Sequence, residues 1–254
     1  MSFGKIFIKS NKMRLDEFLV KKGFCFSRNK AKELIKNGDV IVNKKVIKKP
    51  SFEVSNEDKI EIVKNEQYVS RSAYKLKNFL EKYSITFDKK TVLDIGSSTG
   101  GFSQVALEKK AKKVVAVDVG KDQFHFSLRD NKKIELYENC DIRDFNYSEK
   151  FDIVLSDVSF ISLLKIIKKI DELAKEKIIL LFKPQFEVGK DIKRDKKGVV
   201  LDKEAIKKAK ENFYNECKKL GWKLIKEEEA SIKGKEGNVE YIFYFKKDIN
   251  DKKI

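Results

Sequence analysis

The sequence is poor in the residues and runs that mark metal sites, disulfide scaffolds and membrane spans. Its single histidine, His125, excludes a histidine-rich metal site and argues against a serine–histidine catalytic triad. Its three cysteines, Cys25, Cys140 and Cys217, lie far apart and predict neither a disulfide framework nor metal ligands. No apolar run approaches the roughly 20 residues that a membrane-spanning helix needs, and the N-terminus lacks the apolar core of a signal peptide. These absences predict a cytoplasmic, reduced protein that binds neither metal nor membrane.

Positive charge is what the chain has in abundance. Its 254 residues carry a formal net charge of +17, mostly from lysine, and 41% of them are hydrophobic, which is enough for a core. The length suits one large domain, or one medium and one small domain. The charge has two interpretations: a lysine-rich solvated surface, or a polyanionic partner whose phosphates bind lysine and arginine with release of counterions. Composition alone leaves both open.

Residues 13–63 predict a small, strongly basic first domain, preceded by an extension or tag at 1–12. Apolar spacing predicts a short helix and then a second one at 28–37, for which Ser27 is a good N-cap. Two short strands around a polar turn at Asn43-Lys44 predict a hairpin, and another strand closes the unit. Clustered cations on such a module indicate either a grip on folded RNA or a solvated basic face.

This first domain closely resembles the RNA-binding domain first named from a small-subunit ribosomal protein and shared by pseudouridine synthases. The matching residues are Arg14-Leu15-Asp16, Ser27-Arg28, Gly38-Asp39-Val40 and Val42-Asn43. The resemblance implies that the domain binds RNA. On this basis we expect five cations to contact RNA, four from this domain and one from the start of the next: Arg14, Arg28, Lys30, Lys44 and Arg71.

After a polar linker at 64–69, the pattern alternates between strands and helices. The predicted strands lie at 91–95, 113–118, 134–138, 151–156, 177–182, 222–228 and 239–245, and the predicted helices at 70–83, 102–110, 160–174 and 203–220. The last two strands follow one another closely across Gly234 and Gly237, so they should pair antiparallel. The sequence therefore predicts an α/β fold over residues 70–247, a Rossmann-like, doubly wound sheet of seven strands with the last one antiparallel. A tail follows at 248–254.

A glycine-rich loop follows the first strand of this sheet and begins a helix. This arrangement lets a nucleotide-like ligand approach bare backbone, although it also occurs as an ordinary α/β connection. A dinucleotide fingerprint needs glycine where this loop has Ser98, and the closing hairpin also argues against a dehydrogenase, so the loop favours S-adenosylmethionine. With the acids at successive strand ends, the predicted cofactor contacts are Asp94, Gly96, Ser97, Ser98, Gly100, Gly101, Phe102, Asp118, Asp141, Ile142 and Asp157.

The strand ends also constrain what accepts the methyl group. Methylation of a base amine usually goes with Asn/Asp-Pro-Pro-Tyr after the fourth strand, where this chain has Ser156-Asp157-Val158-Ser159-Phe160. Carbon methylation of a pyrimidine needs a cysteine beside the cofactor, and Cys140 is better explained by packing or by the adenine pocket. A ribose hydroxyl needs a base, and Lys183 and Glu240 are charges in strongly apolar strands. The alternative is that Lys183 reaches solvent from its strand end, with Glu240 as its salt-bridge partner.

Lys75, Asp157, Lys183 and Glu240 occur in the order and context of the Lys-Asp-Lys-Glu tetrad of the FtsJ-like ribose 2′-O-methyltransferases. With Ser70-Arg71-Ser72-Ala73-Tyr74-Lys75 and Lys183-Pro184-Gln185-Phe186-Glu187, they make the chain similar to the TlyA family, also called hemolysin A. The resemblance implies 2′-O-methylation of cytidine in 16S or 23S ribosomal RNA, or both, with S-adenosylmethionine as cofactor. It implies that the protein acts on ribosomal RNA or ribosomal subunits, and we expect a monomer. In this interpretation Lys183 takes the ribose proton, Lys75 and Asp157 tune and hold Lys183, and Glu240 orients Lys75 or the hydroxyl.

Other expectations go with this resemblance. Residues 186–200, rich in lysine and glycine, predict a mobile loop over the RNA site, with a disordered insertion as the alternative. The family's second name keeps a membrane-lytic toxin open, although the sequence has neither a secretion signal nor an exposed amphipathic or spanning segment. The other alternative is a non-catalytic RNA-binding factor for ribosome assembly with a dead cofactor pocket, against which the intact acids and lysine pair argue.

Overall fold

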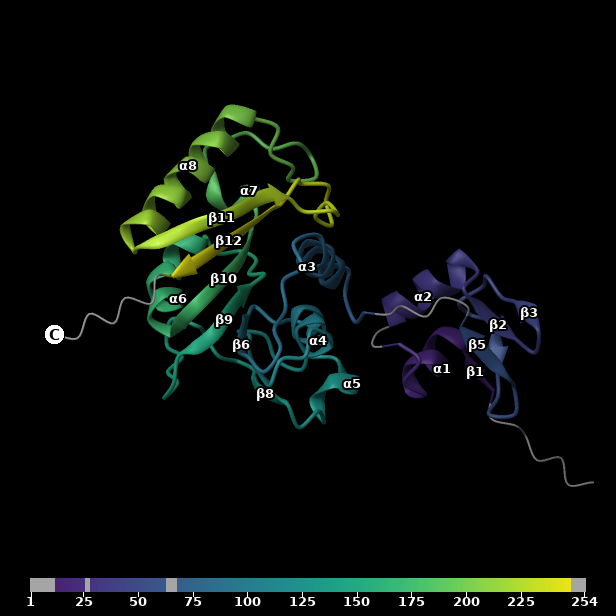
Figure 1. The fold of residues 1–254 in the computed structure, drawn as a ribbon. Helices are drawn as coiled ribbons and strands as arrows, with labels where there is room; N and C mark the ends of the chain where they lie inside the picture. Colours follow the sequence, from purple (N-terminus) through teal and green to yellow (C-terminus); the bar gives the residue numbers. More distant parts are fainter. Residues whose placement is uncertain (1–11, 26–27, 63–67, 248–254) are drawn as a thin grey trace, which may run out of the picture. The chain divides into compact units, whose positions relative to one another are not determined.

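The computed structural model describes residues 12–25, 28–62 and 68–247, in two units that divide after Gln67 (Figure 1). The predicted cap Ser27, most of the extension, residues 64–67 of the linker and the tail lie outside the described residues. Tyr68 and Val69, which we expected in the linker, belong to the second unit. Tyr68 is buried there, and the Val69 amide donates to the Gln104 side chain at 2.8 Å.

The first unit packs two helices against short antiparallel strands. Its helices are α1 (Leu15–Lys21) and α2 (Arg28–Asn37), and its strands are β1 (Met13–Arg14), β2 (Val40–Val42), β3 (Lys45–Val46), β4 (Glu53–Val54) and β5 (Ile60–Ile62). β2 pairs with β3 and β5, and β1 pairs with β4. Asn43 and Lys44 turn the β2–β3 hairpin with φ angles of 49° and 67°, the left-handed pair that suits a two-residue hairpin turn. The predicted helices and hairpin are confirmed.

The second unit is built on a seven-stranded sheet in the order β11-β12-β10-β9-β6-β7-β8. The strands are β6 (Thr91–Ile95), β7 (Lys113–Val117), β8 (Ile134–Tyr137), β9 (Phe151–Ser156), β10 (Ala174–Phe182), β11 (Trp222–Glu229) and β12 (Tyr241–Lys247). β12 runs antiparallel to both of its neighbours, while β6 to β10 pair in parallel. The predicted fold class is therefore confirmed, and the parallel strands deliver their carboxyl ends to one edge.

Helices cover both faces of this sheet (Figure 1). Alternate residues of each strand point to opposite faces, so Leu93 and Val92 enter different core clusters. One face packs against α3 (Arg71–Lys82) and α4 (Gly101–Glu108), and the other against α6 (Ile167–Leu173) and α8 (Lys203–Lys219). The short elements are α5 (Phe126–Arg129), the 3₁₀ turn η1 (Leu163–Lys165) and α7 (Pro184–Glu187).

Several boundaries differ from those predicted by two or three residues, and two of these differences bear on the site. The helix predicted at 160–174 begins only at η1, because residues 157–162 form a loop at the end of β9. β12 begins at Tyr241, so Glu240 stands just before the strand and not inside it. β10 begins three residues earlier than predicted, at Ala174.

Candidate active site

The loop after β6 is shaped by close contacts that exclude larger side chains. Gly96 and Gly100 have φ angles of 76° and 90°, a left-handed conformation that glycine adopts without strain. A Cβ at Gly96 would lie 3.0 Å from the Val158 backbone, and one at Gly100 would lie 2.8 Å from the Phe124 ring. Gly100 also caps α4, so the loop presents backbone groups at a helix N-terminus.

Buried polar atoms without partners gather at the ends of the two central strands. Asp94 of β6 is fully buried, and its Oδ2 accepts a hydrogen bond from Ser103 Oγ at 2.6 Å. Among the described residues, Asp94 Oδ1, Ser97 Oγ and Ser156 Oγ have no hydrogen-bond partner. Since β6 and β9 are neighbours in register at Ile95 and Ser156, these atoms lie at the same carboxyl edge of the sheet, where α/β folds of this kind bind ligands in a crevice. Buried polar atoms of this kind are rare and fit a ligand that carries its own donors.

Burial sets the charge of Asp94. Burial, with the negative charge of Asp157 nearby, outweighs the hydrogen bond from Ser103 and raises the pKa of Asp94 to about 7. A cationic ligand in the crevice would favour the ionised form. The residues present therefore fit S-adenosylmethionine, which carries a sulfonium charge.

The other predicted cofactor residues divide into those at the crevice and those in the core. Asp118, at the end of β7, accepts hydrogen bonds from the amides of Ser98 at 2.8 Å and Gly120 at 2.6 Å, so it holds the glycine loop. Asp141 pairs with Arg143 at 2.6 Å, which holds the pKa of Asp141 below its usual range. Phe102 and Ile142 are buried in the two core clusters of the sheet, and their contact with the cofactor stays a prediction.

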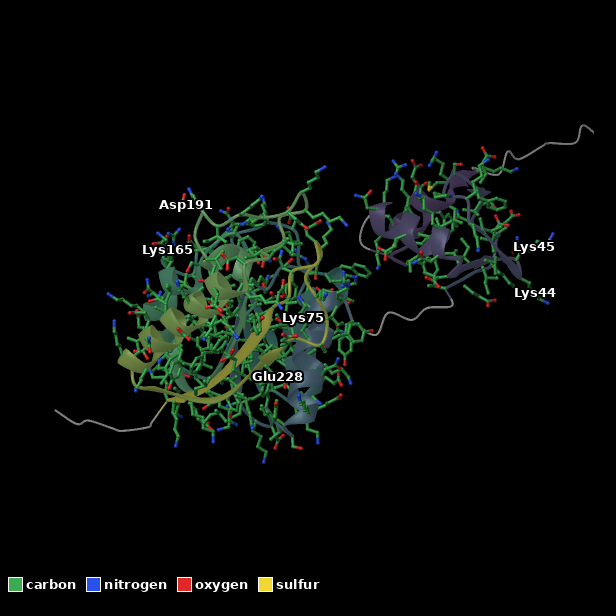
Figure 2. All side chains as sticks on the ribbon, turned by 90° about the horizontal axis from the view of Figure 1, so that it is seen from above. Lys44, Lys45, Lys75, Lys165, Asp191 and Glu228 are labelled. Atoms are coloured by element: carbon green, nitrogen blue, oxygen red, sulfur yellow. The ribbon has the colours of Figure 1, made fainter. Side chains whose placement is uncertain are left out.

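Two buried ion pairs stand beside this crevice, and they involve all four residues of the predicted tetrad. Lys183, which follows β10, places Nζ 2.7 Å from Asp157 Oδ1 and 2.8 Å from Ser159 Oγ. Lys75 of α3, labelled in Figure 2, places Nζ 2.6 Å from Glu240 Oε2. Only 7% of Lys75 and 3% of Glu240 are exposed, so this pair is withdrawn from water.

The pairing differs from the alternatives drawn from sequence. Glu240 pairs with Lys75 and not with Lys183, so the interpretation of Lys183 and Glu240 as salt-bridge partners is wrong. Lys183 is held by Asp157 and Ser159. Lys75, which helical spacing put beside the apolar face of α3, is buried with it because Glu240 compensates its charge.

Two aromatic residues beside Lys183 were missed by sequence reasoning. Phe160 follows Ser159, has a φ of 66° and leaves 92% of its surface exposed. Its ring centroid lies 5.3 Å from that of Phe186 in α7. An exposed aromatic side chain held in a left-handed backbone beside a buried lysine offers a face for stacking. The signal in the sequence was an aromatic residue close behind a strand end.

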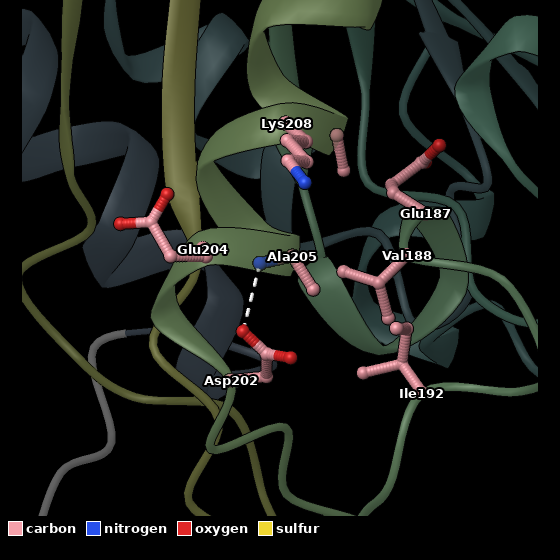
Figure 3. Close-up of a pocket in the computed structure, with 8 residues that line it drawn as sticks. Glu187, Val188, Ile192, Asp202, Glu204, Ala205 and Lys208 are labelled. Atoms are coloured by element: carbon pink, nitrogen blue, oxygen red, sulfur yellow. Dashed lines mark hydrogen bonds between the residues drawn. The ribbon is translucent and has the colours of Figure 1, made fainter.

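Residues 186–200, which we expected to form a mobile loop, are held by hydrogen bonds to one another and to neighbouring residues. Arg194 donates to the carbonyls of Gln185 at 3.0 Å and Gly189 at 2.8 Å. The buried Asn238 accepts from the Val200 amide at 3.0 Å, which ties the segment to the chain just before Glu240. A pocket of about 340 Å³ lies between this segment and the start of α8, with Glu187, Asp202 and Lys208 among its lining residues (Figure 3).

The predicted RNA-binding cations have distinct surroundings. Asp16 is fully buried and accepts from Arg14 Nε at 3.0 Å and from an Arg28 nitrogen at 3.2 Å, so these arginines are fixed by an internal carboxylate. Lys44 is exposed on the hairpin turn, as Figure 2 shows. Lys30 lies 3.4 Å from Glu33. Arg71 belongs to the second unit and is exposed.

The part of the chain that the structure describes has neither a cluster of metal ligands nor a helix that could cross a membrane. No group of three or more histidine, cysteine, aspartate or glutamate side chains is placed there to hold a metal ion. None of the described helices is both long enough and apolar enough to span a bilayer.

Comparisons with known proteins agree with this architecture. The FtsJ-like methyltransferase family matches residues 68–247, and the S4 domain matches residues 13–60. The 23S rRNA (cytidine-2′-O)-methyltransferase TlyA of Campylobacter jejuni subsp. jejuni is 52% identical over 93% of this chain and 100% of that protein. The 16S/23S rRNA (cytidine-2′-O)-methyltransferase TlyA of Mycobacterium tuberculosis is 34% identical over 93% of this chain and 91% of its own. A solved structure from Streptococcus thermophilus, described as a candidate hemolysin, is 29% identical with a TM-score of 0.70, over 94% of this chain and 89% of that one.

Proposed function

The chain belongs to the FtsJ-like methyltransferases, and from that premise we propose that it methylates the ribose 2′-hydroxyl of a cytidine in ribosomal RNA, using S-adenosylmethionine. The observation that carries the proposal is a set of two ion pairs, Lys183 with Asp157 and Lys75 with Glu240. They stand beside the buried polar atoms of the crevice that have no hydrogen-bond partner among the described residues. Ribosomal RNA as substrate places the reaction in the cytoplasm, and we expect a monomer.

The cofactor would lie along the carboxyl ends of the strands. When bound, it supplies an electrophilic methyl group on a sulfonium. The loop at 96–101 presents backbone groups at the N-terminus of α4, and Asp94 and Asp118 offer carboxylates at two adjacent strand ends. Asp118 keeps lone pairs for ribose hydroxyls beyond the two amides that it already accepts from.

Lys183 is the group that we assign to the ribose hydroxyl. Its amine takes the hydroxyl proton as the oxygen–methyl bond forms and the sulfur–methyl bond breaks, and Asp157 and Ser159 stabilise the ammonium ion that results. Lys75 supplies a second positive charge that Glu240 fixes in place. Because the transferred group is a good electrophile, most of the rate comes from holding the oxygen in line with it.

The surroundings of Lys183 suit a nucleotide drawn away from its neighbours. Phe160 offers an exposed ring for the target base, and Phe186 supports that ring from α7. Stacking on an aromatic side chain is the usual way in which proteins hold an unpaired base. Choice among RNAs then falls to the basic first unit, which has the S4 architecture.

A methyl-transfer assay with matched variants tests the proposal. Lys183→Ala should abolish transfer to ribosomal RNA while binding of S-adenosylmethionine, measured by calorimetry, persists. Lys165→Ala is the control, because Lys165 is an exposed lysine of η1 (Figure 2). Normal transfer by Lys183→Ala would show that Lys183 is not the base. Failure of the wild-type protein to bind the cofactor would favour a non-catalytic RNA-binding factor.

A further inference from the structure

A second pocket, of about 330 Å³, lies in the second unit toward the amino end of β10. Its lining includes Lys177 of β10, Lys226 of β11 and Lys246 of β12. Ser84 and Thr86, from the turn after α3, add hydroxyl groups. Among the described residues, no carboxylate lines this lysine pocket. The proposed reaction uses none of these side chains.

Strand register sets like charges directly against one another here. Lys246 of β12 pairs in register with Lys177 on one side and with Lys223 of β11 on the other. Like charges opposite one another on neighbouring strands destabilise a sheet. In the part of the chain described, Lys223, Lys226 and Lys246 have no carboxylate within ion-pair distance, and Lys177 has only Glu176 at 3.6 Å.

Lysines close to the pocket, but outside it, form short ion pairs with carboxylates. Lys90 pairs with Glu176 at 2.9 Å, and Lys247, next to Lys246, pairs with Asp171 at 2.6 Å. Carboxylates are therefore present around this end of the sheet, yet among the residues that the structure describes Lys226 and Lys246 have none within ion-pair distance and Lys177 has only the long contact with Glu176. The Lys226 ammonium also lies 5.2 Å from the centre of the Tyr83 ring, a cation–π contact that holds it at the rim.

We propose that the lysine pocket binds the phosphodiester backbone of a second segment of the ribosomal RNA substrate. Three ammonium groups, together with the hydroxyl groups of Ser84 and Thr86, provide charge and donors for phosphate oxygens, and no carboxylate is among the described lining residues. An apolar or cationic ligand would leave the like charges uncompensated. The proposal rests on the proposed function, because it takes ribosomal RNA as the substrate.

The position of the pocket fits a large substrate. Lys177 of β10 lies six residues before Lys183, which follows that strand, and Lys246 of β12 lies six residues after Glu240, which precedes its strand. Six extended residues span about 20 Å, so the strands that end at the reactive pairs carry the lysine pocket about 20 Å away. A folded ribosomal RNA can reach both places at once, whereas a short oligonucleotide at the reactive lysine cannot.

Salt-dependent RNA binding tests the inference. The full chain with Lys177→Gln, Lys226→Gln and Lys246→Gln is compared with a control that carries Lys168→Gln, Lys207→Gln and Lys218→Gln on α6 and α8. Binding of deproteinised 23S RNA is measured over a series of salt concentrations. The negative slope of log K against log salt should become shallower by about 2 in the pocket variant, because each lost phosphate contact reduces its magnitude by roughly 0.7–0.9. The control should keep the wild-type slope.

Transfer assays separate this inference from the proposed function. Cofactor binding and methyl transfer to a short RNA that contains the target cytidine should be unchanged in the pocket variant, while KM for whole 23S RNA should rise about tenfold. If the pocket variant and the control change the slope equally, or if the pocket variant leaves the slope unchanged, the lysine pocket does not bind the RNA backbone. A wild-type protein that transfers no methyl group would instead overturn the proposed function. If the triple variant unfolds, the exposed Lys246→Gln alone should lower the slope by about 0.7–0.9.

Discussion

The ion pair between Lys75 and Glu240 gives a sharp prediction about stability. Both side chains are more than nine-tenths buried and their charged atoms are 2.6 Å apart. Removal of one partner leaves the other charge buried and uncompensated, which costs about 3–5 kcal/mol. We therefore expect Glu240→Gln and Lys75→Met each to lower the free energy of unfolding by about that amount. The double variant should lose much less than the sum, with a coupling free energy of about 2–3 kcal/mol.

Urea unfolding followed by tryptophan fluorescence measures this coupling. Trp222 is the single tryptophan of the sequence and is buried in the second unit, so its emission reports on the unit that holds the pair. The control is the ion pair of Lys219 with Glu216 on α8, whose side chains are 71% and 39% exposed. Exposed pairs of this kind couple by less than about 1 kcal/mol. A coupling for Lys75 and Glu240 no larger than that of the control would refute the reasoning.

Three further predictions follow from single residues. Burial raises the pKa of Asp94 to about 7, so the folded state favours the neutral carboxyl group. The free energy of unfolding should therefore be highest below about pH 4 and should fall by about 4 kcal/mol in total as the pH rises to 7 and above. Asp94→Asn should remove this loss in urea titrations at pH 5 and pH 8, and an unchanged difference would contradict the burial argument. Burial raises the pKa of Asp16, but hydrogen bonds from Arg14 and Arg28 hold it below its usual range. Its contribution should therefore be present above about pH 4 and lost in acid, and amide hydrogen exchange of the first unit should show acid-dependent opening that Asp16→Asn lacks. Phe160→Ala should reduce transfer to ribosomal RNA about tenfold without changing the melting temperature, since stacking contributes about 1–3 kcal/mol per base and the side chain is 92% exposed; a large drop in melting temperature would show a structural role instead.

Much of the fold could be predicted because its signals are local. Apolar runs such as 91–95 and 151–156 predict strands directly, and the Asn43-Lys44 turn predicts the hairpin. Boundaries that depend on tertiary contacts were less accurate. Tyr68 and Val69 directly follow a polar run in the sequence, but the Tyr68 hydroxyl donates to Glu108 and the Val69 amide donates to Gln104, both in α4.

The site could be predicted in its members but not in its pairings. Lys183 and Glu240 stand out as charges at the ends of apolar strands, which is visible in the sequence. That Lys75 pairs with Glu240, across 165 residues of chain, depends on how α3 packs beside the start of β12. Strand register cannot be predicted from the sequence either. The alignment of Lys246 with Lys177 and Lys223 becomes known only once the order and register of the strands are known.

Transfer of a methyl group to a cytidine ribose of ribosomal RNA, with Lys183 as the base, can be measured directly. Purified protein should be incubated with unmodified ribosomal subunits and S-adenosylmethionine, and the RNA should be digested to nucleosides and analysed by mass spectrometry. We expect 2′-O-methylcytidine with the wild-type protein and none with Lys183→Ala. A methyl group on the base, or 2′-O-methylcytidine at the wild-type rate with Lys183→Ala, would contradict this expectation.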